Sequence, residues 1–300
     1  METAVGNGYK LTLTETLRAY TELMKLRIVA LLCFTTITAM FVAARGVPDL
    51  WLILATMLGG TLAAGGSSAI NQYIDRDMDA QMSRTARRPI PSGRIAPINA
   101  LIFGVALVLW SVVLLTVLVN PLSALLAFIG SIYYVVLYTM VLKRNTVVNI
   151  LIGGGAGAFP VLVGWAAVTN TITFEPLLLF AIVFYWTPPH SWALALLVNK
   201  DYAAARVPMM PVAHGEQATR EQILLYSVQL LLISLLPWFF GVLGWVYAVA
   251  AVALGLGLVY RSVQLLRSGD KKLARITYKY STLYLALLFL VMMLDVLLLG

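Results

Sequence analysis

The sequence contains few charged residues, since Asp, Glu, Lys and Arg together account for only 11% of its 300 residues. About a quarter of the residues in an ordinary soluble domain are charged. Hydrophobic residues reach 61% here, and the mean hydropathy is +0.88. A soluble fold cannot bury so much apolar surface, because surface area does not shrink fast enough with size. The composition therefore excludes a soluble enzyme and a disordered chain, and it indicates a membrane protein.

Cysteine is almost absent, because Cys33 is the only one in the chain. A single cysteine cannot form an internal disulfide, so a disulfide-stabilised scaffold is excluded. The strict alternation of polar and apolar residues that marks the strands of a membrane β-barrel is also lacking. The apolar residues form long continuous blocks instead, which predicts an all-α polytopic membrane protein.

The apolar blocks are long enough to cross a bilayer, which takes about 20 residues of helix. Two of the divisions between blocks rest on short interruptions, one at Asn120-Pro121 and one between Pro237 and Gly244. The sequence predicts nine transmembrane helices, at roughly residues 27–44, 50–74, 98–118, 122–142, 147–167, 175–198, 222–240, 242–262 and 277–299.

The basic residues fall on one side of these spans. If the N-terminus is placed inside, every lysine and arginine except Arg45, with Lys10 among them, lies in an inner segment. Because cytoplasmic loops carry the excess of positive charge, we expect N-in, C-out topology in a plasma or inner membrane. The net charge of +8 is interpreted as topology, and no nucleic-acid partner is expected.

Residues 1–24 are polar and mixed in charge, and they lack the basic-then-apolar layout of a cleaved signal peptide. We expect them to be cytoplasmic and residues 25–300 to form one transmembrane domain, as is typical of a bacterial or archaeal plasma membrane protein. Long inner loops at about residues 75–97 and 199–220 lie four helices apart. This spacing predicts two four-helix halves plus a last helix, although parallel repeats also occur in transporters.

An acidic motif ends the second predicted helix, where Asn71, Asp75 and Asp79 are spaced four residues apart. Residues at this spacing share a helix face, whereas Asp77 should face elsewhere. Two carboxylates one turn apart repel each other unless a cation lies between them. Mg²⁺ suits such oxygen ligands and commonly bridges carboxylates to a substrate phosphate. The motif predicts a metal site, and a solvated acidic helix end is the alternative.

Arginines follow this motif in the first long loop, at Arg84, Arg87, Arg88 and Arg94. Their guanidinium groups match phosphate or carboxylate oxygens, although contact with lipid headgroups explains the same charges. Beside a carboxylate–Mg²⁺ site, an anion-binding role is favoured, because a diphosphate needs acidic residues for its metal and basic residues for its own charge.

The second long loop opens with Asn199-Lys200-Asp201-Tyr202. The Asp201 carboxylate would meet Asp75 and Asp79 if the two halves of the chain face one another. A plain capped helix end explains the same residues, so both interpretations stay open at this point.

Polar residues also lie within the fifth and sixth apolar blocks. Asn149 needs a hydrogen-bonding partner inside its span, and it precedes a glycine run at residues 153–157. Pro188 and Pro189 are expected to interrupt the sixth helix, because prolines leave backbone carbonyl groups free. His190 then either bonds to one of these carbonyl groups or faces a substrate.

Together these segments resemble the UbiA-type intramembrane prenyltransferases over about residues 20–295, and more narrowly the branch that farnesylates protohaem IX. Four segments carry the resemblance: Asn71 to Asp79 with Met82-Ser-Arg84-Thr85 and Arg88-Pro89, Tyr138 to Arg144 with Thr146 and Asn149, Thr187-Pro-Pro-His190 with Trp192, and Asp201-Tyr202 with Val207-Pro-Met-Met-Pro-Val.

The resemblance implies Mg²⁺-dependent transfer of farnesyl from farnesyl diphosphate to the vinyl group of haem b, giving haem O and diphosphate. Asp75, Asp79 and Asp201 would hold the metal with Asn71 beside them, and the Tyr138 ring would stabilise an allylic cation. A haem A synthase or a terminal oxidase is a candidate partner. The residues implied in binding diphosphate or haem, with His190 near the haem, are Arg84, Arg88, Lys143, Arg144, Asn149, His190, Lys200 and Arg206.

The sequence departs from the superfamily pattern after Asp201, where three alanines and Arg206 replace a second acidic pair that many members carry. Lys200 or Arg206 is expected to supply the positive charge that a second Mg²⁺ supplies in those members. Another acceptor, such as a quinone precursor, a chlorophyll-type ring or a lipid, is the nearest alternative. A membrane transporter is the alternative of a different class, although transporters place ionisable residues near the midplane.

Overall fold

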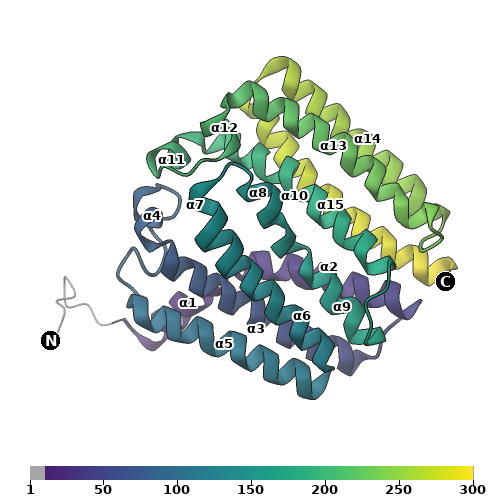
Figure 1. The fold of residues 1–300 in the computed structure, drawn as a ribbon, viewed down its shortest axis with the longest axis horizontal. Helices are drawn as coiled ribbons and strands as arrows, with labels where there is room; N and C mark the ends of the chain where they lie inside the picture. The colour runs from purple at the N-terminus through teal and green to yellow at the C-terminus, as the bar shows by residue number, and fades with distance from the viewer. Residues whose placement is uncertain (1–10, 300) are drawn as a thin grey trace.

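The computed structural model describes residues 11–299, and all regular elements in that range are helices (Figure 1). Lys10 lies outside the described residues. Four short helices, α1 (Leu13–Met24), α4 (Arg76–Gln81), α11 (Asn199–Ala204) and α12 (Met210–Ala213), accompany the long ones. The described residues include nine segments long and apolar enough to cross a membrane: α2 (Leu26–Ala44), α3 (Leu50–Ile74), α5 (Pro97–Leu118), α6 to α7 (Pro121–Asn145), α8 to α9 (Asn149–Thr169), α10 (Glu175–Leu197), α13 (Gly215–Phe239), α14 (Trp245–Ser268) and α15 (Lys271–Leu299).

The predicted all-α membrane fold is confirmed, including both short interruptions. Asn120 separates α5 from the next span, and its side chain accepts a hydrogen bond from the backbone N–H of Ser123 at 2.8 Å. The chain turns again between Phe239, the last residue of α13, and Trp245, the first residue of α14. The side of the membrane on which the N-terminus lies stays a prediction.

The packing of the helices repeats along the chain. In the first half α3 packs on α5 and α5 on α6 (Pro121–Ile132), while in the second half α10 packs on α13 and α13 on α14. The halves meet where α2 packs on α9 (Phe159–Thr169), and α15 contacts α14, α10 and α2. This equivalence agrees with two four-helix halves plus a last helix.

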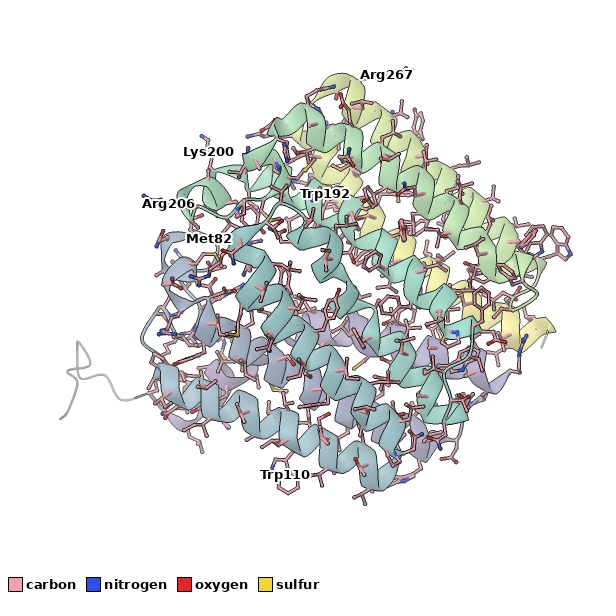
Figure 2. The ribbon with its side chains drawn as sticks, in the orientation of Figure 1. Met82, Trp110, Trp192, Lys200, Arg206 and Arg267 are labelled. Carbon is pink, nitrogen blue, oxygen red and sulfur yellow. The ribbon has the colours of Figure 1, made fainter. Side chains whose placement is uncertain are left out.

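Large apolar side chains cover the outside of the bundle. Trp110 points away from α5 in Figure 2 and is 61% exposed, and Leu109 beside it is 57% exposed. Helices satisfy their own backbone hydrogen bonds, so they can present such side chains to lipid without exposing polar backbone. These residues therefore form a lipid-facing surface.

Two spans differ from what the sequence predicts. The expected interruption of the sixth helix is wrong, because α10 continues through Pro188 and Pro189 to Leu197. Helices α13 and α15 pack along α10, and prolines are tolerated inside membrane helices where neighbouring helices compensate for the freed backbone groups. The fourth span instead contains a π-helix, η1 (Tyr133–Leu142), which no proline or glycine in those ten residues announces.

Asp295 has a structural role that the sequence did not reveal. Its buried carboxylate, on α15, accepts hydrogen bonds from the backbone N–H groups of Gly244 at 2.5 Å and Tyr247 at 2.9 Å. These N–H groups start α14 and have no partner within that helix, so Asp295 acts as an N-cap supplied by another helix.

Replacing Asp295 by alanine is expected to lower the free energy of unfolding by about 1–3 kcal/mol, because two buried donors lose their acceptor. Thermal unfolding of the purified protein in one detergent measures this loss. Asp49→Ala is the matched control, because Asp49 caps α3 through Leu52 at 2.9 Å but is exposed. An Asp295 variant no less stable than the control would contradict the capping role.

Candidate active site

Asp75 lies at the junction of α3 and α4, where its carboxylate is fully buried. The amide nitrogen of Asn71, one turn earlier, donates to Asp75 Oδ2 at 2.7 Å and to the Thr139 hydroxyl at 3.1 Å. The amide oxygen of Asn71 accepts from Lys25 Nζ at 3.2 Å. Asn71 thus links three distant parts of the chain at the acidic motif.

Basic side chains from the fourth span neutralise Asp75. Lys143 Nζ forms an ion pair with Asp75 Oδ2, and Arg144 lies 3.5 Å from Asp75 Oδ1. Asp75 Oδ1 has no hydrogen-bond partner among the described residues, although it is buried. A buried, charged oxygen without a hydrogen bond is unfavourable. This oxygen is therefore available to a ligand.

Asp77 faces away from this buried cluster, as the helix spacing predicts, and its side chain is 60% exposed. Its two oxygens accept hydrogen bonds from Arg144 at 2.8 and 2.7 Å. These bonds favour the charged carboxylate and lower the pKa of Asp77 to about 2. Asp77 therefore orients the Arg144 guanidinium group, which also lies near the buried Asp75 carboxylate.

Asp79 is buried one turn after Asp75, so the two carboxylates share the buried side of the motif. Arg88 Nη1 donates to Asp79 Oδ2 at 2.7 Å, and the Thr85 hydroxyl donates to the Asp79 carbonyl at 2.8 Å. The arginine-rich loop that follows α4 thus folds back onto the end of that helix.

The two long loops meet at Asp201. Both of its carboxylate oxygens lie 3.0 Å from the Ser83 hydroxyl, and Arg84 donates to the Tyr202 hydroxyl at 3.3 Å. The described residues contain no group of three His, Cys, Asp or Glu side chains that could hold a metal ion together. Asp201 therefore faces the first long loop without joining Asp75 and Asp79.

Lys200 and Arg206 lie at the outer edge of the second loop, where both are exposed (Figure 2). Arg206 adopts a left-handed backbone conformation with φ of 53° as the loop leaves α11. In this structure neither side chain is part of the buried carboxylate cluster.

Tyr138 lies on η1 and stacks on Tyr134, with ring centroids 5.6 Å apart. The Thr139 hydroxyl, next to Tyr138, accepts from Asn71 and donates to the Tyr134 carbonyl at 2.8 Å. Lys143 follows Tyr138 by five residues, a spacing that brings two side chains to one side of a π-helix, whose hydrogen bonds join residues i and i+5. The π-helix thus presents both tyrosines near the cluster.

Asn149 and His190 have different hydrogen-bond partners. Asn149 is buried, and its amide nitrogen donates to the Lys143 carbonyl at 3.4 Å, so it supports the segment that carries Lys143. His190 Nδ1 lies 2.8 Å from the Ser281 hydroxyl, and the ring stacks on Trp186 with centroids 4.3 Å apart. A serine of α15, and not a freed carbonyl group, is therefore its partner.

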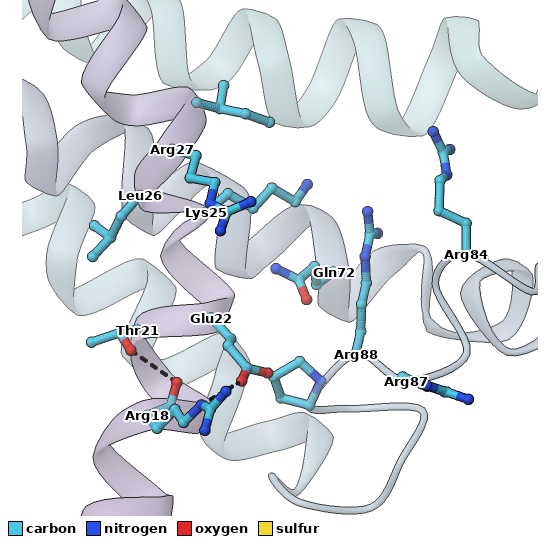
Figure 3. Close-up of a pocket in the computed structure, with 12 residues that line it drawn as sticks. Arg18, Thr21, Glu22, Lys25, Leu26, Arg27, Gln72, Arg84, Arg87 and Arg88 are labelled. Atoms are coloured by element: carbon cyan, nitrogen blue, oxygen red, sulfur yellow. Dashed lines mark hydrogen bonds and ion pairs between the residues drawn. The ribbon is translucent and has the colours of Figure 1, made fainter. Parts of the chain in front are cut away.

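A cavity of about 680 Å³ opens beside the carboxylates, between the α1–α2 junction and the first long loop (Figure 3). Lys25 and Arg88 reach into it from these two segments. Burial, with the positive charges of Arg88 and Lys143 nearby, lowers the pKa of Lys25 to about 7. The basic side chains that line the cavity favour an anionic ligand.

Three residues of the cluster were missed by the sequence interpretation as site residues. The sequence interpretation used Lys25 only as one of the positive charges on the inner side of the membrane. Its position just before an apolar block could have marked it as a site residue. Thr139 lies in a segment that carries the resemblance but was not singled out there, and Tyr134 lies outside it; their place in the site depends on the π-helix and on contact with α3.

The fold and site define a class of protein: a polytopic membrane protein with two buried carboxylates, one of them paired with an arginine that lines a basic cavity. A profile described as the UbiA prenyltransferase family matches residues 32–293. The chain belongs to the UbiA prenyltransferase family.

Several relatives carry the same description. "Protoheme IX farnesyltransferase" of Symbiobacterium thermophilum is 51% identical over 285 residues, covering 94% of this chain and 95% of that protein. The protein of that name from Deinococcus radiodurans is 45% identical over 98% of this chain and 97% of its own length. The protein of that name from Roseiflexus sp. (strain RS-1) is 51% identical over 93% of this chain. The chain spans about half of that relative's length, 52%.

Solved structures show the same fold. A structure of digeranylgeranylglyceryl phosphate synthase superposes with a TM-score of 0.79 at 18% identity, over 95% of this chain and 100% of that one. A UbiA homolog from Archaeoglobus fulgidus bound to DMAPP and Mg²⁺ gives 0.67 at 17% identity, over 91% and 98%. At such low identity these likenesses establish the fold alone.

Proposed function

We propose that the chain transfers a farnesyl group from farnesyl diphosphate to the vinyl group of haem b, giving haem O and diphosphate. The names of the relatives support this acceptor. The structural observation that carries the proposal is the pair of buried carboxylates, Asp75 and Asp79, each held by basic side chains from another segment beside a cavity. Acidic residues for a metal and basic residues for an anion are what a diphosphate requires.

The carboxylates fit a magnesium ion. Asp75 Oδ1 is buried without a hydrogen-bond partner among the described residues, and hard oxygen ligands are those that Mg²⁺ prefers. Asp75 and Asp79 would hold the ion, with Asn71 orienting Asp75, whereas Asp201 of the second loop contacts Ser83 and lies outside this pair. When bound, the metal would neutralise charge on the departing diphosphate.

Basic side chains would then bind the diphosphate oxygens. Lys143 and Arg88 neutralise the carboxylates in this structure. Once a metal ion neutralises the carboxylates, these two side chains would bind the phosphates instead. Arg144 would follow Lys143, while Arg84, Lys200 and Arg206 would supply further positive charge from the two loops. Asn149 would keep the Lys143 segment in place.

Departure of diphosphate would leave an allylic cation. The faces of the Tyr138 and Tyr134 rings would stabilise this cation, because aromatic rings attract positive charge. The vinyl group of haem b would attack it, and water would then close the product to a hydroxyethylfarnesyl side chain. His190 would lie near the haem, oriented by the Ser281 hydroxyl.

The setting of the reaction follows from its substrates. A farnesyl chain of about fifteen carbons gains on the order of 10 kcal/mol from leaving water, at about 0.8 kcal/mol per CH₂. We place the chain in a plasma membrane with both long loops cytoplasmic, where a haem A synthase or a terminal oxidase could receive the product.

Haem extracted from cells with and without this protein tests the acceptor. Expression of the intact chain should add a haem species whose mass equals haem b plus one farnesyl group and one hydroxyl group, added across the vinyl double bond. A cell that makes the protein but no new haem would reject haem b as the acceptor. Prenylated quinones, chlorophyll-type rings or lipids in the same extract would identify the alternative.

Gly153 is expected to position the Tyr138 ring. A Cβ atom at Gly153 would overlap that ring, whereas one at Gly157 would meet no atom within 4 Å. Gly153→Ala should lower kcat about 10- to 100-fold, because small displacements of a catalytic group have effects of that size. Gly157→Ala is the matched control.

A double-mutant cycle separates positioning from general damage. In a Tyr138→Ala background the ring is gone, so Gly153→Ala should cause little further loss of kcat. An equal loss in both backgrounds would show that Gly153 does not act through Tyr138.

A further inference from the structure

The cavity beside the carboxylates is lined by an excess of cations. Six of the side chains around it are basic and a single one is acidic: Arg18, Lys25, Arg27, Arg84, Arg87 and Arg88 against Glu22. The Glu22 carboxylate is already engaged, because Arg94 donates to it at 2.7 Å. The lining therefore carries a net positive charge that attracts anions.

Most of these cations lack an acidic partner of their own. Arg88 pairs with Asp79, and Arg18 lies 3.5 Å from Glu22. Within residues 11–299 no ion pair joins Arg27 or Arg87 to a carboxylate. Arg27 lies at the start of α2 and faces the cavity in Figure 3. It is thus a cation at the cavity wall without a protein anion.

The same cavity has an apolar wall. Leu26 and Ile28 line it beside Arg27 and are 46% and 57% exposed. They belong to the first turn of α2, where that membrane-spanning helix begins. A ligand that satisfies both walls carries negative charge at one end and an apolar body at the other.

The basic residues near the carboxylates differ from those that would bind an anionic ligand in this cavity. Lys143 and Arg144 contact the carboxylates from the fourth span, whereas Arg18 and Arg27 lie on the α1–α2 side and contact none of the metal-binding carboxylates. Arg88 lies between these two groups, pairing with Asp79 while lining the cavity. An acceptor seated in the cavity would therefore lie beside a diphosphate held at the carboxylates.

We propose that this cavity binds the carboxylate groups of the acceptor, with Arg27 and Arg18 as their outer partners. The inference rests on the proposed function, because haem b is an apolar ring that carries two propionates. Guanidinium groups pair with carboxylates through two parallel hydrogen bonds, so they recognise the charged edge and leave the vinyl edge free to react.

The test measures binding without turnover. Iron(III) mesoporphyrin IX has ethyl groups in place of vinyl groups and cannot be prenylated, and its dimethyl ester lacks the two negative charges. Each is titrated by absorbance into the full chain in phosphatidylcholine nanodiscs. The wild type is expected to bind the diacid at least about tenfold tighter than the ester, the size of one charged hydrogen bond.

The Arg18→Gln/Arg27→Gln variant should bind the diacid about as weakly as the ester, with ester affinity and the KM for farnesyl diphosphate unchanged. Arg267→Gln is the control, because Arg267 is exposed at the end of α14, remote from this cavity (Figure 2). Equal wild-type affinity for diacid and ester, or equal weakening of both in the variant, would overturn the proposal.

A lipid phosphate is the other source of an anionic group. If phosphatidylglycerol in the nanodisc abolishes the preference for the diacid, and native mass spectrometry finds this lipid lost from the Arg18→Gln/Arg27→Gln variant, the cavity is a lipid site and the proposal fails. Diacid preference with no farnesylated haem in cells would overturn the reaction while leaving the carboxylate site standing.

Discussion

Replacing Asp75 by asparagine is expected to lower kcat for prenyl transfer by at least about 10²–10³-fold. Losing a single preorganised electrostatic group in an active site has effects of this size. Asparagine keeps the shape of the side chain and can still accept the hydrogen bond from Asn71, so the protein should remain folded and inserted. The change removes the negative charge that a metal ion needs and leaves Lys143 without its counter-ion.

Asp77→Asn is the matched control for this variant. Asp77 is two residues away on the same segment, but its side chain is 60% exposed and pairs with Arg144. We expect it to change kcat by no more than a few-fold. Gel filtration and thermal unfolding in detergent establish that both variants are folded. A folded Asp75→Asn protein with near wild-type turnover would remove Asp75 from the active site.

Chelation of divalent metal is expected to abolish activity reversibly. EDTA in excess over Mg²⁺ should stop prenyl transfer, and added Mg²⁺ should restore it, because the two buried carboxylates repel a diphosphate unless a cation lies between them. Product formation followed by mass at a fixed concentration of farnesyl diphosphate measures this effect.

The structure also predicts what chelation leaves intact. Lys143 and Arg144 neutralise Asp75 and Arg88 neutralises Asp79, so the buried charges keep partners without a metal. The thermal unfolding temperature should therefore change little on chelation. Full activity in excess chelator would contradict the metal role, and a large fall in the unfolding temperature would make the metal structural.

The membrane fold was predictable because its signals are local. Apolar blocks of about 20 residues define spans wherever they occur, and short breaks such as Asn120-Pro121 separate them. The shared face of Asp75 and Asp79 follows from helix geometry over one turn. The continuous α10 was not predictable, because the effect of Pro188 and Pro189 depends on how neighbouring helices pack along them.

The partners of the site residues required the folded chain. The π-helix brings Thr139 to Asn71, and this register depends on packing against α3 and leaves no mark in the composition of the segment. Asp201 meets Ser83, and not the two buried carboxylates, because the second loop folds over the first.

The amino-acid sequence by itself determined that this is a helical membrane protein whose acidic motif ends its second span and whose arginines follow at once. Only the tertiary structure decided which bases neutralise which acids and where the basic cavity opens. Spans and helix faces depend on residues close together in the chain. Ion pairs such as Lys143 with Asp75, and the link from Lys25 to Asn71, join residues far apart and form only when the helices pack.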